Sequence, residues 1–142
     1  MNDQLMLAWA AGFIDGEGSI LFTRRSGRTR DFSMKLQAVN TNIKSLERLK
    51  DLFGGSIHSL HNEKKAYGKN WKPSWIWSCS HRKAEETIRA LLPFLLIKRE
   101  QADLALLTRN YVGVKFRRKS AETQELLAEL MGQMHTLNKK GR

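Results

Sequence analysis

The feature that most constrains this chain is a run of small and apolar residues that ends in two acids and two glycines, at positions 7–18. A surface helix carries a polar face as well as an apolar one. This run has almost no polar residue before Asp15, so it lacks such a polar face. We therefore predict a helix over about residues 4–17 that is buried all round. The carboxylates of Asp15 and Glu17 come at its C-terminal end, where the helix dipole disfavours negative charge. A divalent cation at Glu17 would compensate for this cost.

Small residues recur at every fourth position of the predicted helix, at Ala8, Gly12 and Gly16. One face of the helix is thus nearly bare backbone, so a second helix can approach closely. The alternative is a tightly packed helix that ends in a glycine-rich turn, in which the acidic side chains have no functional role.

Composition narrows the class of protein. The 142 residues predict one domain over 1–142, long enough to bury a core. The net charge of +11 favours a polyanionic partner over a neutral one. No long apolar run indicates a membrane partner, and a single cysteine, Cys79, cannot form an internal disulfide or a cysteine-based zinc site. With no sign of a secretory signal, we expect an intracellular protein.

Residues 19–25 and 32–39 alternate between apolar and polar side chains and are predicted to form a hairpin with one apolar face. A two-stranded ribbon of this kind fits the DNA major groove, where amide, hydroxyl and basic side chains match base edges. The alternative is an ordinary solvated sheet face. The predicted DNA-contacting residues of this hairpin and its turn are Thr23, Arg25, Arg28, Arg30, Ser33, Lys35 and Gln37.

The rest of the chain continues the mixture of helices and strands. The predicted elements are a helix at 43–53 with N-cap residues at 40–42, strands at 56–60 and 75–80, and helices at 82–92, 98–109 and 120–137. In the last strand we place Trp75, Trp77 and Cys79 toward the core and Ile76 and Ser78 outward. The alternative makes the tryptophans a stacking platform for unpaired bases. This order predicts an α+β domain whose antiparallel sheet is covered by helices on one face.

Residues 10–18, with the sequence AAGFIDGEG, resemble the signature of the LAGLIDADG homing endonucleases. The Pro93-Phe94-Leu95 step before Lys98 resembles a second block of that family. The resemblance covers nearly the whole chain and implies an αββαββα fold. It also implies a site-specific endonuclease for double-stranded DNA. The motif occurs once, and family members of this length act as homodimers on a long pseudo-palindromic site.

The same resemblance implies the active-site residues. Glu17 from each subunit and the Gly16 carbonyl would hold Mg²⁺, which Mn²⁺ can replace, and no small-molecule cofactor is expected. Lys98 would polarise water or stabilise charge on the phosphate. Asn40 would order active-site water, and Lys44 would be the second basic residue of the pocket. Glu17 stands where the family more often has aspartate, and Asn40 where it often has glutamine.

Two further sets of residues complete the predicted site. Basic loops and outward strand positions would add DNA contacts, largely to phosphates, at His58, Lys64, Lys65, Ile76, Ser78, Lys115, Arg117 and Arg118. The predicted dimer interface comprises Ala8, Ala11, Gly12, Asp15 and Gly16. There Asp15 would cap or bond backbone rather than bind metal.

Two other functional classes remain open from the sequence. The first is a splicing maturase or a DNA-binding regulator on the same scaffold, which binds nucleic acid without cutting it. The second is an interaction protein whose basic face is merely solvated, and it predicts weak binding to DNA of any sequence with no dependence on metal.

Overall fold

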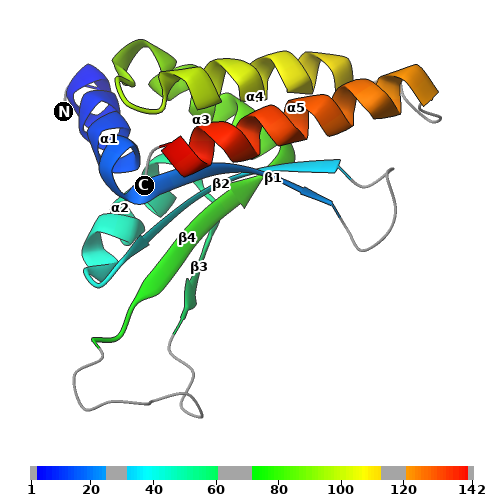
Figure 1. The fold of residues 1–142 in the computed structure, drawn as a ribbon. Helices are drawn as coiled ribbons and strands as arrows, with labels where there is room; N and C mark the ends of the chain where they lie inside the picture. Colours follow the sequence, from blue (N-terminus) through cyan, green and yellow to red (C-terminus); the bar gives the residue numbers. More distant parts are fainter. Residues whose placement is uncertain (1–2, 25–31, 61–71, 113–120, 141–142) are drawn as a thin grey trace.

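The computed structural model describes residues 3–24, 32–60, 72–112 and 121–140, which form an α+β fold (Figure 1). The strands form one layer and most of the helical mass lies on one side of it. The elements in chain order are α1 (Asp3–Glu17), β1 (Gly18–Arg24), β2 (Phe32–Asn40), α2 (Ile43–Phe53), β3 (Ser56–Ser59), β4 (Trp75–Ser80), α3 (His81–Leu91), the short 3₁₀ helix η2 (Leu92–Phe94), α4 (Arg99–Val112) and α5 (Ala121–Lys140).

The four strands form one antiparallel sheet in the order β1-β2-β4-β3. The two hairpins β1-β2 and β3-β4 therefore join through β2 and β4 at the centre of the sheet. Leu36 of β2 lies opposite Ile20 of β1 and Cys79 of β4. Because side chains alternate across a strand, this register places the three residues on the same face of the sheet.

That face is the core. Its fully buried side chains from the strands are Ile20, Met34, Leu36, Ala38 and Trp77. Cys79 is also buried, and Trp75 packs against the same core cluster. The predicted phase of the last strand, with Trp75, Trp77 and Cys79 toward the core, is thus confirmed.

Helix α2 begins and ends where its local sequence predicts. The side chain of Asn42 accepts a hydrogen bond of 3.0 Å from the Lys44 backbone, which caps the first turn. Gly54 and Gly55 then follow with φ of 74° and 86°, a conformation that suits glycine. A Cβ on Gly55 would lie 2.5 Å from the backbone oxygen of Ser78, so the chain can turn against β4 only with glycine there.

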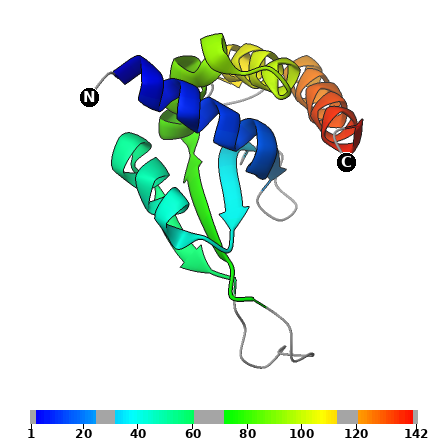
Figure 2. The same ribbon diagram turned by 90° about the vertical axis from the view of Figure 1, so that its left-hand side faces the viewer.

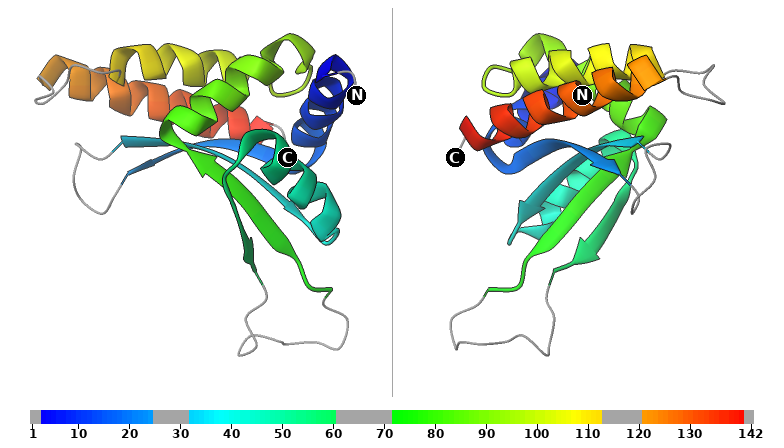
Figure 3. Two further views of the ribbon diagram at one scale, coloured as in Figure 1. Left: turned by 180° about the vertical axis from the view of Figure 1, so that it is seen from behind. Right: turned by 45° about the vertical axis from the view of Figure 1, so that its right-hand side comes forward.

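Helices α4 and α5 run side by side over the sheet, and α1 lies at one end of the layer (Figures 1 and 2). The face of the sheet that points away from these helices, the lower side in Figure 3, is covered by no helix of the described residues. An ion-pair network joins the helices, because the carboxylate of Glu85 on α3 accepts from Arg89 at 3.0 Å and from Arg109 on α4 at 3.1 Å. None of the helices in the described ranges has the length and apolarity needed to span a membrane.

Helix α1 is less buried than the sequence predicts. Ala10, Ala11, Ile14 and Asp15 face the core, but much of the helix is exposed or half-buried. The expectation of a helix buried all round is therefore wrong for the single chain. The reason is its position, because α1 lies at the end of the layer and packs on the rest of the chain along one side only.

Candidate active site at the end of α1

A cavity of about 600 Å³ lies where α1 meets β1 and the start of α4, and we call it the Glu17 cavity. It brings together segments from both ends of the chain. Its lining residues are Asp15, Gly16, Glu17, Gly18, Ser19, Leu21, Val39, Ile97, Lys98, Gln101 and Asn138. Three of the residues predicted for the catalytic centre, namely Gly16, Glu17 and Lys98, therefore line one cavity.

Asp15 connects the end of α1 to the segment that leads into α4. Its Oδ2 accepts a hydrogen bond from the backbone N–H of Leu96 at 2.8 Å, and its Oδ1 accepts from those of Ile97 at 3.1 Å and Lys98 at 2.9 Å. Asp15 is 8% exposed. Since both carboxylate oxygens already accept hydrogen bonds from backbone, Asp15 is poorly suited to bind a metal ion.

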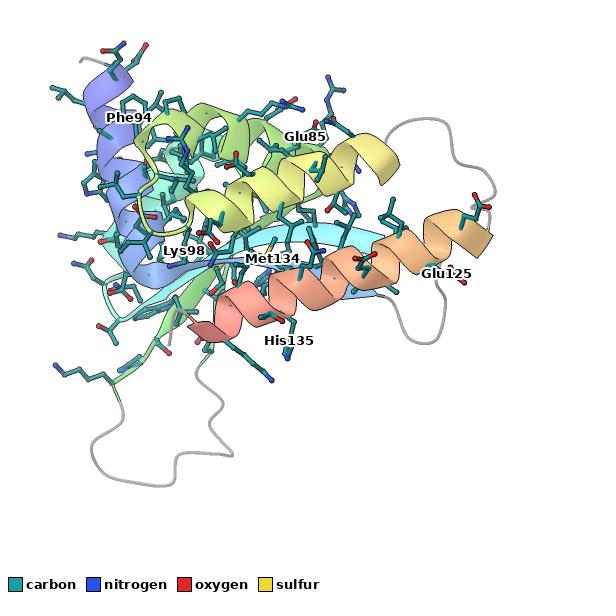
Figure 4. The ribbon with its side chains drawn as sticks, turned by 45° about the horizontal axis from the view of Figure 1, so that its top comes forward. Glu85, Phe94, Lys98, Glu125, Met134 and His135 are labelled. Atoms are coloured by element: carbon teal, nitrogen blue, oxygen red, sulfur yellow. The ribbon has the colours of Figure 1, made fainter. Side chains whose placement is uncertain are left out.

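Lys98 lies beside the C-terminal end of α1, where α4 begins (Figure 4). Its ammonium group donates a hydrogen bond of 2.6 Å to the backbone oxygen of Asp15. This is the end of α1 with partial negative charge, which a cation stabilises. Burial lowers the pKa of Lys98, and the nearby carboxylates of Asp15 and Glu17 oppose that shift. The lysine is thus held as a half-buried positive charge within the Glu17 cavity.

Glu17 differs from Asp15 in that its side chain is exposed and makes no hydrogen bond to any described residue. It ends α1 and borders the cavity together with the backbone of Gly16. No group of three or more His, Cys, Asp or Glu side chains that could hold a metal occurs in the described parts of the chain. One carboxylate and one carbonyl nevertheless fit Mg²⁺, which binds through one or two carboxylates and keeps waters and substrate phosphates as its other ligands.

Asn40 and Lys44, the other two predicted catalytic residues, do not line the Glu17 cavity. The Oδ1 of Asn40 accepts a hydrogen bond of 2.7 Å from the backbone of Asn42, so this side chain supports the turn into α2. Lys44 is exposed on the first turn of α2.

The open face of the sheet, opposite the core, carries the predicted DNA-contacting residues that the structure describes. The pairing places Gln37 between Ser19 and Ser78, and Lys35 between Leu21 and Ser80. Longer polar side chains on the central strand β2 are therefore flanked mostly by short ones. The remaining predicted residues on this face are Thr23, Ser33, Ile76 and His58, by the same alternation.

Eight predicted DNA-contacting residues lie outside the described residues. They are Arg25, Arg28, Arg30, Lys64, Lys65, Lys115, Arg117 and Arg118. The described part of the open face is consequently more neutral than the sequence as a whole, because much of the basic charge of the chain falls in these segments.

The predicted dimer residues divide between two sides of α1. Ala8, Gly12 and Gly16 form an exposed stripe, and a Cβ built on either glycine would meet nothing within 4 Å. Ala11 and Asp15, in contrast, are buried in the core of their own chain. Of the five predicted interface residues, only the three of the stripe are exposed to a second helix.

Sequence reasoning missed several residues that line the Glu17 cavity. Gln101 lies one helical turn after Lys98, and this spacing could have indicated it. Asn138 carried no such signal. The prediction ended the last helix at about residue 137, whereas α5 continues to Lys140 and Asn138 donates a hydrogen bond of 3.0 Å to the backbone oxygen of Ile20.

No protein-family model matches the chain, and no curated protein sequence matches it. Solved structures match its fold. The homing endonuclease I-CvuI in complex with its target has a TM-score of 0.73 at 22% identity, over 95% of this chain and 83% of that chain. The archaeal intron-encoded homing endonuclease I-Vdi141I, complexed with DNA, has a TM-score of 0.72 at 16% identity, over 96% and 86% of the two chains. The LAGLIDADG meganuclease I-AabMI, bound to uncleaved DNA, gives 0.67 at 21% identity, over 88% of this chain and 43% of that one.

Proposed function

We propose that this chain, which has the fold of the LAGLIDADG homing endonucleases, is a site-specific endonuclease that cuts double-stranded DNA as a homodimer. One observation carries the proposal. An exposed carboxylate, Glu17, and a half-buried ammonium group, Lys98, share a cavity that Ser19, Leu21 and Val39 connect to the open face of the sheet. A phosphate of DNA lying on that face would come within reach of both charges.

The charge and shape of the chain support DNA as the substrate. The net charge of +11 attracts a polyanion, and its basic residues would contact phosphates without reading sequence. The open face supplies groups that can read bases, since glutamine pairs with adenine and lysine with guanine in the major groove. Gln37 and Lys35 occupy the centre of that face.

The reaction is the hydrolysis of a phosphodiester. The oxygen of a water molecule forms a bond to phosphorus while the bond from phosphorus to the 3′ oxygen breaks, and protons pass from the water and to the leaving 3′ oxygen through solvent. Glu17 and the Gly16 carbonyl would hold Mg²⁺, which when bound supplies charge stabilisation and an activated water. The ammonium group of Lys98 would stabilise negative charge that develops on the phosphate. Asp15 holds Lys98 in place for this role.

The dimer follows from the exposed stripe on α1. Two copies of α1 that meet at Ala8, Gly12 and Gly16 could pack closely, because these residues add little beyond backbone. Such a contact is self-complementary and would place the Glu17 residues of both chains near the two-fold axis. The target would then be a near-palindrome whose symmetry matches that of the protein.

The test is a cleavage selection on a library of long randomised DNA, run with Mg²⁺ and with EDTA. The wild-type chain should cut both strands at one near-palindromic site, and chelator or the Glu17→Gln variant should abolish cutting. Glu47→Gln, which changes the same charge on the exposed face of α2, serves as the matched control and should cut normally. Specific binding without any cut would favour a maturase or a regulator, and binding without a preferred site would contradict the proposal altogether.

A further inference from the structure

Gln101 stands apart from the other buried polar residues of the chain. The described residues include four of this kind, namely Asp15, Thr87, Gln101 and Thr108. Asp15 accepts three backbone hydrogen bonds, and the hydroxyls of Thr87 and Thr108 each donate one of 2.7 Å to their own helix. Gln101 is 7% exposed, yet its side chain makes no hydrogen bond to any described residue.

The side-chain amide of Gln101 has no hydrogen-bond partner among the described residues, but it is not sealed from solvent. No side-chain nitrogen or oxygen atom in the described residues is sealed from solvent without a partner. The amide of Gln101 must therefore remain accessible, and Gln101 lines the Glu17 cavity. Burying an amide without a hydrogen bond is costly, so a buried amide left open to a cavity is suited to bind what the cavity holds.

We infer that Gln101 is a catalytic residue whose side-chain amide orients the attacking water. In this arrangement Oε1 accepts a hydrogen bond from the water while Nε2 donates one to an oxygen of the scissile phosphate. The inference rests on the proposed function. It assigns to Gln101 the water-ordering role that the sequence assigned to Asn40.

The other polar groups of the cavity are less suited to this role, including the hydroxyl of Ser19, which offers a single oxygen where an amide offers a separate donor and acceptor. Lys98 has no acceptor, and Glu17 has no donor when ionised. Asn138 already uses its Nδ2 on the backbone of Ile20. Asn40 lies outside the cavity lining, and its Oδ1 accepts from the backbone of Asn42. Gln101 keeps both a donor and an acceptor free, one helical turn from Lys98.

The test is single-turnover cleavage of the selected target by Gln101→Met, which keeps the length of the side chain and removes its polar atoms. The cleavage rate should fall by about 10²-fold, the loss expected when one group that positions reacting atoms is removed. Affinity for the target, measured with EDTA present, and the melting temperature should not fall. The control is Gln133→Met, the same change at an exposed position of α5, which should leave the rate unchanged.

Gln101→Glu adds a signature that a purely structural role would not give. A protonated carboxyl group has one donor and one acceptor, like an amide, whereas the ionised form has only acceptors. The variant should therefore cut best at acid pH and lose activity relative to the wild type as the pH rises.

The outcomes separate this inference from the proposed function. If the wild-type chain cuts and Gln101→Met cuts within about threefold of it, the role of Gln101 is refuted and the endonuclease stands. If affinity falls in step with the rate, Gln101 anchors DNA and does not orient water, which also refutes the inference. If the wild-type chain cuts no DNA, the proposed function and the inference fail together.

Discussion

Replacing Asp15 by alanine should destabilise the chain by roughly 2–4 kcal/mol. The carboxylate accepts three backbone hydrogen bonds, and each bond to a charged group contributes about 1.5–3 kcal/mol, so the three together would contribute roughly 5–9 kcal/mol. The full sum does not apply, because Leu96 and Ile97 are 85% and 68% exposed. Water can reach that segment and replace part of what the carboxylate provides.

The Asp15→Asn variant gives an intermediate result that tests the geometry. Oδ1 accepts from two N–H groups, those of Ile97 and Lys98, and an amide oxygen in its place can still accept both. The amide NH₂ would then face the N–H of Leu96, where Oδ2 now accepts a hydrogen bond, and two donors cannot pair. We expect a loss of about 1–2 kcal/mol, between wild type and alanine.

The measurement is urea denaturation at neutral pH and at one fixed protein concentration, since the stability of the proposed dimer would depend on concentration. Asp103→Ala is the matched control, because this exposed acid on α4 makes no hydrogen bond or ion pair to any described residue. Its free energy of unfolding should change by less than about 0.5 kcal/mol. If Asp15→Ala cost no more than this control, the argument that Asp15 ties α1 to the start of α4 would be refuted.

Three further predictions concern the same end of α1. Because burial lowers the pKa of Lys98, its ammonium is lost as the pH rises through that lowered value, and cleavage should decline there. In Lys98→Arg the guanidinium stays protonated, so a pH–rate profile of its remaining activity should lack this decline. Gly12→Leu faces open space in one chain, so circular dichroism should show a folded protein while sedimentation shows monomers; an unchanged dimer would contradict the proposed interface. Gly18→Ala should lower stability in urea by about 1–3 kcal/mol, because its Cβ would lie 2.8 Å from the backbone oxygen of Ile14, whereas unchanged stability would mean that the helix end yields easily.

The sequence predicted those parts of the fold that depend on local pattern. Helix α2 has the predicted bounds, because the N-cap at Asn42 and the turn at Gly54 are both short-range signals. The alternation in β2 placed Met34 and Leu36 in the core correctly. The order of helices and strands was enough to predict an antiparallel sheet covered on one face, since each apolar face must be buried by a neighbouring element.

The parts that the sequence could not predict depend on contacts between distant residues. The hydrogen bonds of Asp15 reach across 81 to 83 positions, and no periodicity reports such a pairing. Asn138 meets Ile20 across 118 positions in the same way. The catalytic role of Asn40 came from resemblance alone, and the distances that a cavity imposes are not visible in a motif. Which face of α1 is exposed likewise depends on where the helix sits at the end of the layer.

The two acids of the motif illustrate why local pattern and tertiary contact answer different questions. Residues two apart on an α-helix point about 200° away from each other, so Asp15 and Glu17 cannot serve one face. Asp15 points into its own chain and fixes the segment that carries Lys98, while Glu17 stays exposed at the cavity. The spacing alone predicts that the two acids have separate roles. Their contacts in the folded chain are needed to assign a role to each acid. One acid therefore positions the cation of the site, and the other is left free to hold a metal ion.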